Sequence, residues 1–307
     1  MSAGAGASHH TAAAHNKGAM LVCAAAIIWS SGGLIARFIQ ADVWTQAAGR
    51  GLFGCLALLI FLLLRDGRNT WSLFRNLGLP GIAVGVCFAT ASLCFVIALR
   101  HTTVATILII QSTSPLIAAL VAWIWMREAI GWARWVAMVV ALGGVTLMVS
   151  GGSTGGDGAG GDRLGILLSM VIPVAIAFAT VTVRRYQNIR MTPAGCVACA
   201  LLALAGLSMR DWGLQVAMSD VGLLFLFGAC QLALGLICFT IGARLVPAAE
   251  ASLLGLLESV LGPLWVWIFL AEHPGSYALI GGALVLAAVA GNTLYDQRRV
   301  TTPVHTV

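Results

Sequence analysis

The sequence predicts an all-α integral membrane protein with ten transmembrane helices, arranged in two inverted five-helix repeats around a central cavity. Three observations predict this fold class. The 307 residues are 60% hydrophobic and only 9% charged, with a mean hydropathy of +0.96, whereas soluble domains carry about 25% charged residues. Apolar runs of about 20 residues, the length that crosses a bilayer as a helix, recur along the whole chain. The second half of the chain repeats the pattern of the first.

The apolar runs divide into two groups of five on either side of a glycine-rich stretch, residues 151–162. They are residues 18–37, 43–64, 77–99, 103–125, 132–150, 164–183, 191–209, 221–243, 248–270 and 276–295. We therefore predict a first repeat over 18–150, a flexible external linker over 151–162 and a second repeat over 163–297. The small polar residues 1–17 are expected to be a disordered cytoplasmic tail, and residues 298–307 a second cytoplasmic tail.

The distribution of basic residues predicts the orientation in the membrane. Most Lys and Arg residues fall on one side if both termini are placed there. Basic loops stay in the cytoplasm, so we expect both termini to be cytoplasmic. The net charge of +6 is attributed to this bias and not to nucleic-acid binding. The expected partners are the lipid bilayer and a small-molecule substrate, with the protein a monomer or a weak oligomer.

The repeat itself is visible in the sequence, because residues 94–147 align without a gap with residues 238–291. Each half has an odd number of crossings, so the two halves enter the membrane from opposite sides. Inverted repeats are typical of secondary transporters, in which the substrate site lies between the halves near the midplane. The identities least expected by chance are Arg100/Arg244, Trp123/Trp267, Glu128/Glu272 and Gly131/Gly275.

Two matching motifs carry a resemblance to a known family. They are SPLIAALVAWIWMREAIGW (114–132) and LLESVLGPLWVWIFLAEHP (256–274), each followed by paired glycines. With them the chain resembles the drug/metabolite transporter superfamily, in its ten-helix branch, and within that branch the bacterial aromatic amino acid exporters. The resemblance implies a secondary transporter without a cofactor. It would export aromatic and other neutral amino acids across the bacterial inner membrane by alternating access. Met138 departs from the family pattern, where glycine is usual, and this puts the packing of the fifth helix in question.

Polar residues at mid-depth are the candidates for the substrate site. A carboxylate in the membrane is costly unless it faces a cavity or a partner, so Glu258 marks a functional position by default. The repeat places the Gln111–Pro115 run at the same depth. The predicted substrate-cavity residues are Trp29, Ser30, Gln111, Ser112, Thr113, Gln231 and Glu258.

Simpler roles remain open for several of these residues. Ser and Thr can bond their own helix and join neighbouring helices, Trp29 can pack or face lipid, and Glu258 can form a structural hydrogen bond. Proton coupling would follow if Glu258 titrates. Arg50, which is also similar to a common family position, is expected to pair with a carboxylate or with backbone carbonyls rather than with substrate.

Prolines and terminal glutamates are the candidates for moving parts. A proline inside a helix removes a backbone donor and permits bending. The predicted hinge or gate residues are Pro115, Pro173, Pro263, Glu128 and Glu272, the two glutamates being gate or structural residues at helix ends.

Other function classes receive less support. The sequence contains no GxxxxGK[ST] motif, so ATP is not expected to drive transport within this chain. Organic cations, drugs or other metabolites on the same scaffold remain the alternative substrates. A membrane-embedded enzyme is a remote alternative, since it would need a cluster of His, Asp and Glu. Cys196 and Cys199 form a CxxC pair without a second ligand pair, so neither a metal site nor an enzyme is expected.

Overall fold

The computed structural model describes residues 3–102, 107, 110–127, 131–150, 163–210, 216–270 and 276–301, and these residues form helices and short connections without a strand. The first half contains α1 (Ala3–Ser30), α2 (Gly32–Phe38), α3 (Val43–Asp66), η1 (Gly67–Asn69), α4 (Thr70–Arg75), α5 (Gly78–His101), α7 (Ser114–Met126) and α8 (Trp132–Ser150). The second half contains α9 (Arg163–Arg185), α10 (Thr192–Ser208), α11 (Met218–Phe225), η3 (Leu226–Ala233), α12 (Leu234–Gly242), α13 (Ala248–Gly255), α14 (Leu257–Leu270) and α15 (Ser276–Thr301).

These elements account for the ten predicted segments. Five described helices are long and apolar enough to cross a membrane, and shorter apolar helices lie in the fourth, fifth, seventh and tenth segments. The fourth segment is short because a turn at Ser112 and Thr113 precedes α7, and the ninth is divided into α13 and α14. The protein is therefore an all-helical, multi-pass membrane protein, as predicted.

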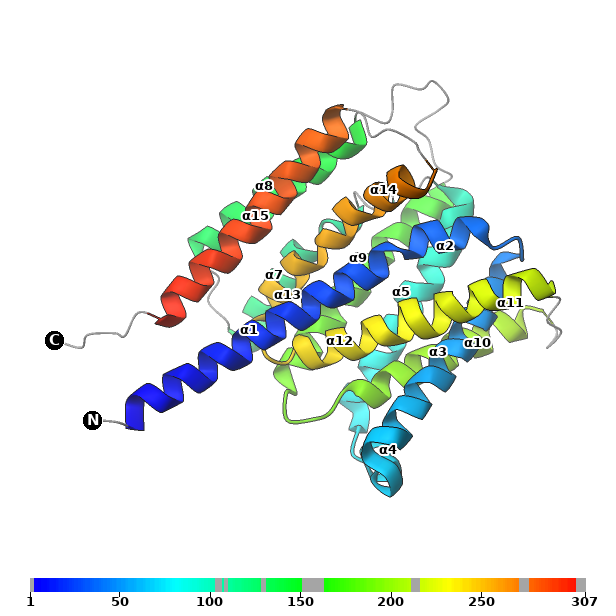
Figure 1. Cartoon of the computed structure of the whole chain (residues 1–307), viewed down its shortest axis with the longest axis horizontal. Coiled ribbons are helices and arrows are strands. Elements are labelled where there is room, and N and C mark those ends of the chain that lie inside the picture. Colours follow the sequence, from blue (N-terminus) through cyan, green and yellow to red (C-terminus); the bar gives the residue numbers. More distant parts are fainter. Residues whose placement is uncertain are drawn as a thin grey trace.

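Helix neighbours follow the two-repeat symmetry. Equivalent segments of the two halves pack on each other: α3 packs on α10, α8 packs on α15, and α7 of the fourth segment packs on α13 of the ninth. Helix α1 packs on α12 in the same way as α9 packs on α5. Exchanging the halves therefore exchanges equivalent contacts, as a pseudo-two-fold axis requires. Figure 1 shows α8 and α15 side by side, and both chain termini at the same end of the molecule.

The N-terminal residues differ from the prediction for 1–17. The structure continues α1 back to Ala3, where the sequence predicts a disordered tail. Alanine is the best helix former, and this stretch carries several alanines directly before the first apolar run. Adding such residues to an existing helix avoids the cost of nucleating a new one.

Three helices are interrupted at the level of the site. Helices α1 and α2 meet at Ser31, a turn at Ser112–Thr113 precedes α7, and α13 and α14 meet at Leu256. In the alignment of residues 94–147 with 238–291, the turn at 112–113 corresponds to 256–257, so the two halves break at equivalent points. Irregular backbone at membrane depth is tolerated where it is buried in protein or lines a cavity.

The predicted hinge residues occupy different settings. Pro115 lies in the first turn of α7, where a missing donor costs little because no intrahelical partner is needed. It therefore starts a helix and does not bend one. Pro173 lies inside α9 and is buried, so it stays a hinge candidate, and Pro263 lies within α14. Glu128 and Glu272 lie outside the described residues.

The backbones of helices α3 and α10 lie in close contact between the halves. A Cβ atom on Gly51 would lie 2.4 Å from the backbone nitrogen of Ala203, and one on Gly206 would lie 2.5 Å from that of Ala48. Only glycine allows the two backbones to approach so closely.

An ion pair lies at each end of this helix pair. Arg190 Nη1 is 2.6 Å from Asp66 Oδ1, and Arg210 Nε is 3.7 Å from Asp42 Oδ2.

Candidate functional site

A partly open cavity lies between the two halves, next to the interrupted helices. Both halves contribute to its wall. The lining residues are Trp29, Gly32, Arg50, Phe88, Ala91, Ser92, Phe95, Gln111, Ile172, Ile176, Ala198, Cys199, Leu202, Gln231, Leu232, Leu236 and Glu258. Most are apolar, with a few polar groups that converge on one space, as is typical of small-molecule sites.

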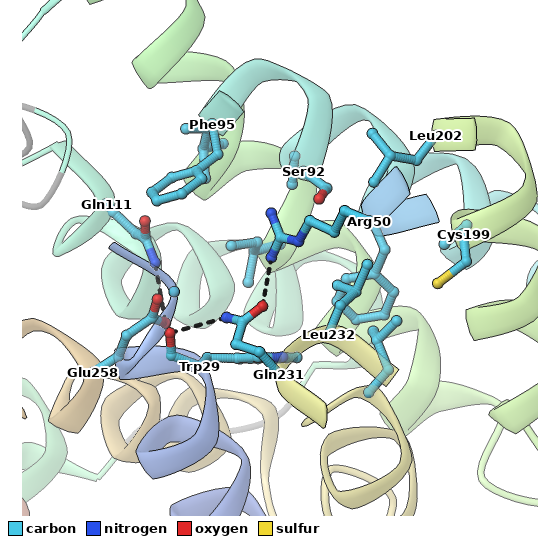
Figure 2. Close-up of a pocket in the computed structure, with 17 residues that line it drawn as sticks. Trp29, Arg50, Ser92, Phe95, Gln111, Cys199, Leu202, Gln231, Leu232 and Glu258 are labelled. Carbon is cyan, nitrogen blue, oxygen red and sulfur yellow. Dashed lines mark hydrogen bonds between the residues drawn. The ribbon is translucent and has the colours of Figure 1, made fainter. Parts of the chain in front are cut away.

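The acidic side of the cavity is formed by Glu258 at the start of α14 and Gln111 just before the turn that leads to α7. Gln111 Nε2 donates to Glu258 Oε2 across 3.5 Å, which is a long and weak hydrogen bond. Both side chains are only partly buried. The carboxylate therefore keeps acceptor capacity toward the cavity (Figure 2).

The basic side of the cavity is formed by Arg50 of α3. Arg50 is only 6% exposed, and its guanidinium lies 4.2 Å from the centre of the Phe227 ring. Arg50 Nη2 donates to Gln231 Oε1 at 3.0 Å. Within the described part of the chain, Arg50 Nε and Nη1 are buried and have no hydrogen-bond partner. Because a buried donor without a partner is costly, these nitrogens favour a ligand that brings an acceptor.

Gln231 links the basic side to the break in the first helix. It lies in the π-helix η3, and short π-helical segments often occur at functional sites. Its Nε2 donates to the backbone oxygen of Trp29 at 3.0 Å. Figure 2 shows Glu258 and Gln111 on one side, Arg50 on the other, and Gln231 connecting Trp29 with Arg50.

Opposite charges thus face one cavity without meeting. Among the described residues, no ion pair or hydrogen bond joins Arg50 to Glu258. Apolar residues such as Phe88, Phe95 and Ile176 form the rest of the wall. The arrangement suits a solute that carries both a positive and a negative group on an apolar body.

The structure places the seven predicted cavity residues in two groups. Trp29, Gln111, Gln231 and Glu258 line the cavity, whereas Ser30, Ser112 and Thr113 are not part of its lining. Ser30 Oγ accepts from Trp265 Nε1 at 2.7 Å and donates to the Ile27 oxygen at 2.6 Å.

The two residues of the turn do not open onto the cavity. Thr113 Oγ1 donates to the Ile110 oxygen at 2.7 Å, and Ser112 is 1% exposed. The Thr113 hydroxyl therefore serves the interrupted backbone, which is the simpler role that Ser and Thr often have in membrane helices.

Sequence reasoning assigned Arg50 to structural pairing and missed the apolar wall. Arg50 pairs with a side-chain amide and lines the cavity, where a carboxylate or carbonyl partner away from substrate was expected. One signal in the sequence could have placed Arg50 in the cavity. Its side chain is long and charged, and the polar Gln231 lies at a similar depth in the membrane. Phe88 and Phe95 give no such signal, because an aromatic residue in a membrane helix can equally face lipid.

Comparisons with known proteins agree with this architecture. A crystal structure described only as that of a protein matches with a TM-score of 0.74 at 20% identity, covering 92% of this chain and 99% of that chain. At this identity the likeness shows the fold. No curated protein matches the sequence.

The family is shown by the sequence. The model of the EamA-like transporter family matches residues 16–150 and again residues 161–294, so it covers most of the chain in two successive copies. The chain therefore belongs to the EamA-like transporter family, within the drug/metabolite transporter superfamily, and is a multi-pass membrane transporter and not an enzyme.

Proposed function

We propose that this protein is a secondary transporter that exports amino acids, aromatic and other neutral ones, across the bacterial inner membrane by alternating access. The observation that carries the proposal is the separation of charge in the cavity. Arg50 offers a carboxylate two donors that have no partner in the described part of the chain, and Glu258 offers an acceptor to an ammonium group. Phe88 and Phe95 supply an apolar wall for a side chain.

The direction of export rests on the narrower resemblance of the chain to bacterial aromatic amino acid exporters, and the sidedness rests on the charge bias. Both termini lie at one end of the molecule (Figure 1), which agrees with both being cytoplasmic. Basic residues also gather where helices α9 and α12 end, namely Arg185, Arg190 and Arg244. Basic residues favour the cytoplasmic face of a membrane protein.

Organic cations are the second candidate, because Glu258 and the rings of Trp29, Phe88 and Phe95 would also suit an aromatic amine. Arg50 argues against them. A buried guanidinium without a carboxylate partner repels a cation at close range, and its open donors would stay unsatisfied.

Counterflow in proteoliposomes tests the proposal. Vesicles loaded with unlabelled phenylalanine should accumulate labelled phenylalanine, and threonine should compete, whereas lysine and a quaternary amine should compete poorly. Empty vesicles and vesicles with the Arg50→Ala variant are the controls. Accumulation of the quaternary amine without any amino acid would favour the second candidate, and no transport of any amino acid would sink the exporter proposal.

A further inference from the structure

Gln231 uses both ends of its amide within the wall of the cavity. Its Oε1 accepts from Arg50 Nη2 at 3.0 Å, and its Nε2 donates to the Trp29 oxygen at 3.0 Å. The residue is 4% exposed, so little of it is free to touch a solute. The chemistry of Gln231 is therefore directed at Arg50 and not at the cavity space.

Two neighbouring residues, Gly32 and Phe227, also help to fix the positions of Gln231 and Arg50. A Cβ atom on Gly32 would lie 2.7 Å from Gln231 Nε2, so the glycine leaves room for the amide beside the break between α1 and α2. The ring of Phe227, which is fully buried, lies under the Arg50 guanidinium at 4.2 Å. The guanidinium is thus fixed by a hydrogen bond at one nitrogen and by a ring at one face. Its Nε and Nη1 are buried without a hydrogen-bond partner among the described residues, which favours an acceptor that a ligand brings.

We propose that Gln231 is a positioning residue that holds Arg50 with its free donors toward the substrate carboxylate, and that it thereby sets selectivity for carboxylate-bearing solutes over amines. This inference rests on the proposed function, since it names how one charged group of the amino acid is recognised. Arg is suited to this role because its planar fork matches a carboxylate, and pre-organising the fork reduces the entropy lost on binding.

A neutral amide serves this purpose better than a carboxylate would. Glutamine satisfies one donor of Arg50 and leaves the positive charge uncompensated for an incoming anion. A glutamate at position 231 would neutralise the guanidinium and occupy the donors itself. It would also place a negative charge beside the Trp29 carbonyl oxygen, where the amide now donates.

Two variants and three solutes test the inference. Gln231→Leu removes both hydrogen bonds at similar size, and Gln231→Glu keeps an acceptor for Arg50 but adds a charge. The solutes are phenylalanine, phenethylamine, which lacks the carboxylate, and 3-phenylpropionate, which lacks the ammonium group. Cys230→Ala is the matched control, because Cys230 is the preceding residue of the same π-helix and is exposed.

The expected results separate positioning from structure. Gln231→Leu should raise the KM for phenylalanine about tenfold, since a hydrogen bond to a charged group contributes about that much, with kcat nearly unchanged. Inhibition by phenethylamine should change less than about twofold. Gln231→Glu should shift the preference toward phenethylamine by about tenfold or more, because the added charge repels carboxylates and attracts amines. An equal loss for all three solutes would show a merely structural role and overturn the inference.

A binding measurement keeps this test independent of transport. In detergent, 3-phenylpropionate should raise the Tm of the wild type and of Cys230→Ala, and should not raise that of Gln231→Leu. If the wild type transports no amino acid but shows this pattern, the exporter proposal fails while the role of Gln231 stands. If 3-phenylpropionate stabilises Gln231→Leu as much as the wild type, the role of Gln231 is refuted even where phenylalanine is transported.

Discussion

At the scale of single residues, the cavity combines a symmetric scaffold with asymmetric chemistry. The alignment of the repeats pairs Glu258 with Ser114 and Gln111 with Gly255. At each of these positions only one half carries the longer polar side chain, so the cavity has one acidic side. A substrate that bound a symmetric cavity could sit in two equivalent orientations, whereas fixed charges of opposite sign select one.

Glu258 is predicted to bind the ammonium group of the substrate. Glu258→Gln should raise the KM for phenylalanine about tenfold, the loss expected when a hydrogen bond to a charged group is weakened. Binding of 3-phenylpropionate, which has no ammonium group, should change little. If Glu258 also carries protons, the pH dependence of transport should disappear in the variant. An unchanged KM together with an unchanged pH profile would leave Glu258 a structural residue.

Arg50 is predicted to need the planar geometry of its guanidinium, and not only its charge, to bind substrate. Arg50→Lys keeps the positive charge but loses the planar donors that hold Gln231 and a carboxylate together. Its affinity for phenylalanine should fall about tenfold or more, from the loss of one charge-assisted hydrogen bond. Competition assays over a range of phenylalanine concentrations measure the change. A lysine variant with wild-type affinity would show that the charge alone suffices.

The sequence predicts polar cavity residues better than apolar ones. Glu258, Gln111 and Gln231 stand out because a polar group at membrane depth needs a partner or a cavity. Phe88 and Phe95 do not stand out, since lipid and the cavity wall select the same apolar side chains. Whether a hydroxyl faces the cavity or its own backbone is decided by local geometry, which the sequence does not contain.

At the scale of elements, helix number is readable from the sequence, but helix interruptions are harder to place. The apolar runs predict where membrane segments lie because their length must match the bilayer. The break at Leu256 occurs within an apolar stretch directly after Gly255, and glycine is too frequent in this chain, with 36 residues, to mark a break by itself. The π-helix η3 has an equally ordinary sequence. Both features depend on packing between segments that are distant in the chain.

The contact between α3 and α10 is predicted to be intolerant of any added atom. Gly51→Ala would place a Cβ 2.4 Å from the Ala203 nitrogen and 2.6 Å from the Cys199 oxygen. Backbone atoms cannot move aside as a flexible side chain can, so the helices must separate, and overpacking costs about 1–3 kcal/mol. The Tm in detergent should fall by several degrees. Gly143→Ala in α8 is the control, because no atom lies within 4 Å of its added Cβ.

At the scale of the whole molecule, polar contacts join the two halves at the end that carries the N-terminus. His15 Nε2 of α1 lies 3.3 Å from Glu250 Oε1 of α13, and Arg134 Nη2 of α8 lies 4.0 Å from Glu250 Oε2. Arg185 Nη1 of α9 donates to the oxygen of Trp125 in α7 at 2.9 Å. Glu250 is fully buried at the centre of this group. Alternating access would require these contacts to break when the cavity opens to this side.

Glu250→Gln is therefore predicted to favour the state that opens toward the N-terminal side. The neutral amide removes the attraction of the Glu250 carboxylate for His15 and Arg134 in the arrangement that joins them, and every 1.4 kcal/mol lost there shifts a two-state population about tenfold. Ser92→Cys, in a background without the native cysteines, places a thiol in the cavity wall. An impermeant maleimide added from the N-terminal side should label it about tenfold faster or more when Glu250→Gln is present.

Arg68→Gln, which removes an exposed charge before α4, should leave the rate unchanged. Equal rates with and without Glu250→Gln would mean that this cluster does not hold the cavity closed, because labelling depends directly on the population of the open state.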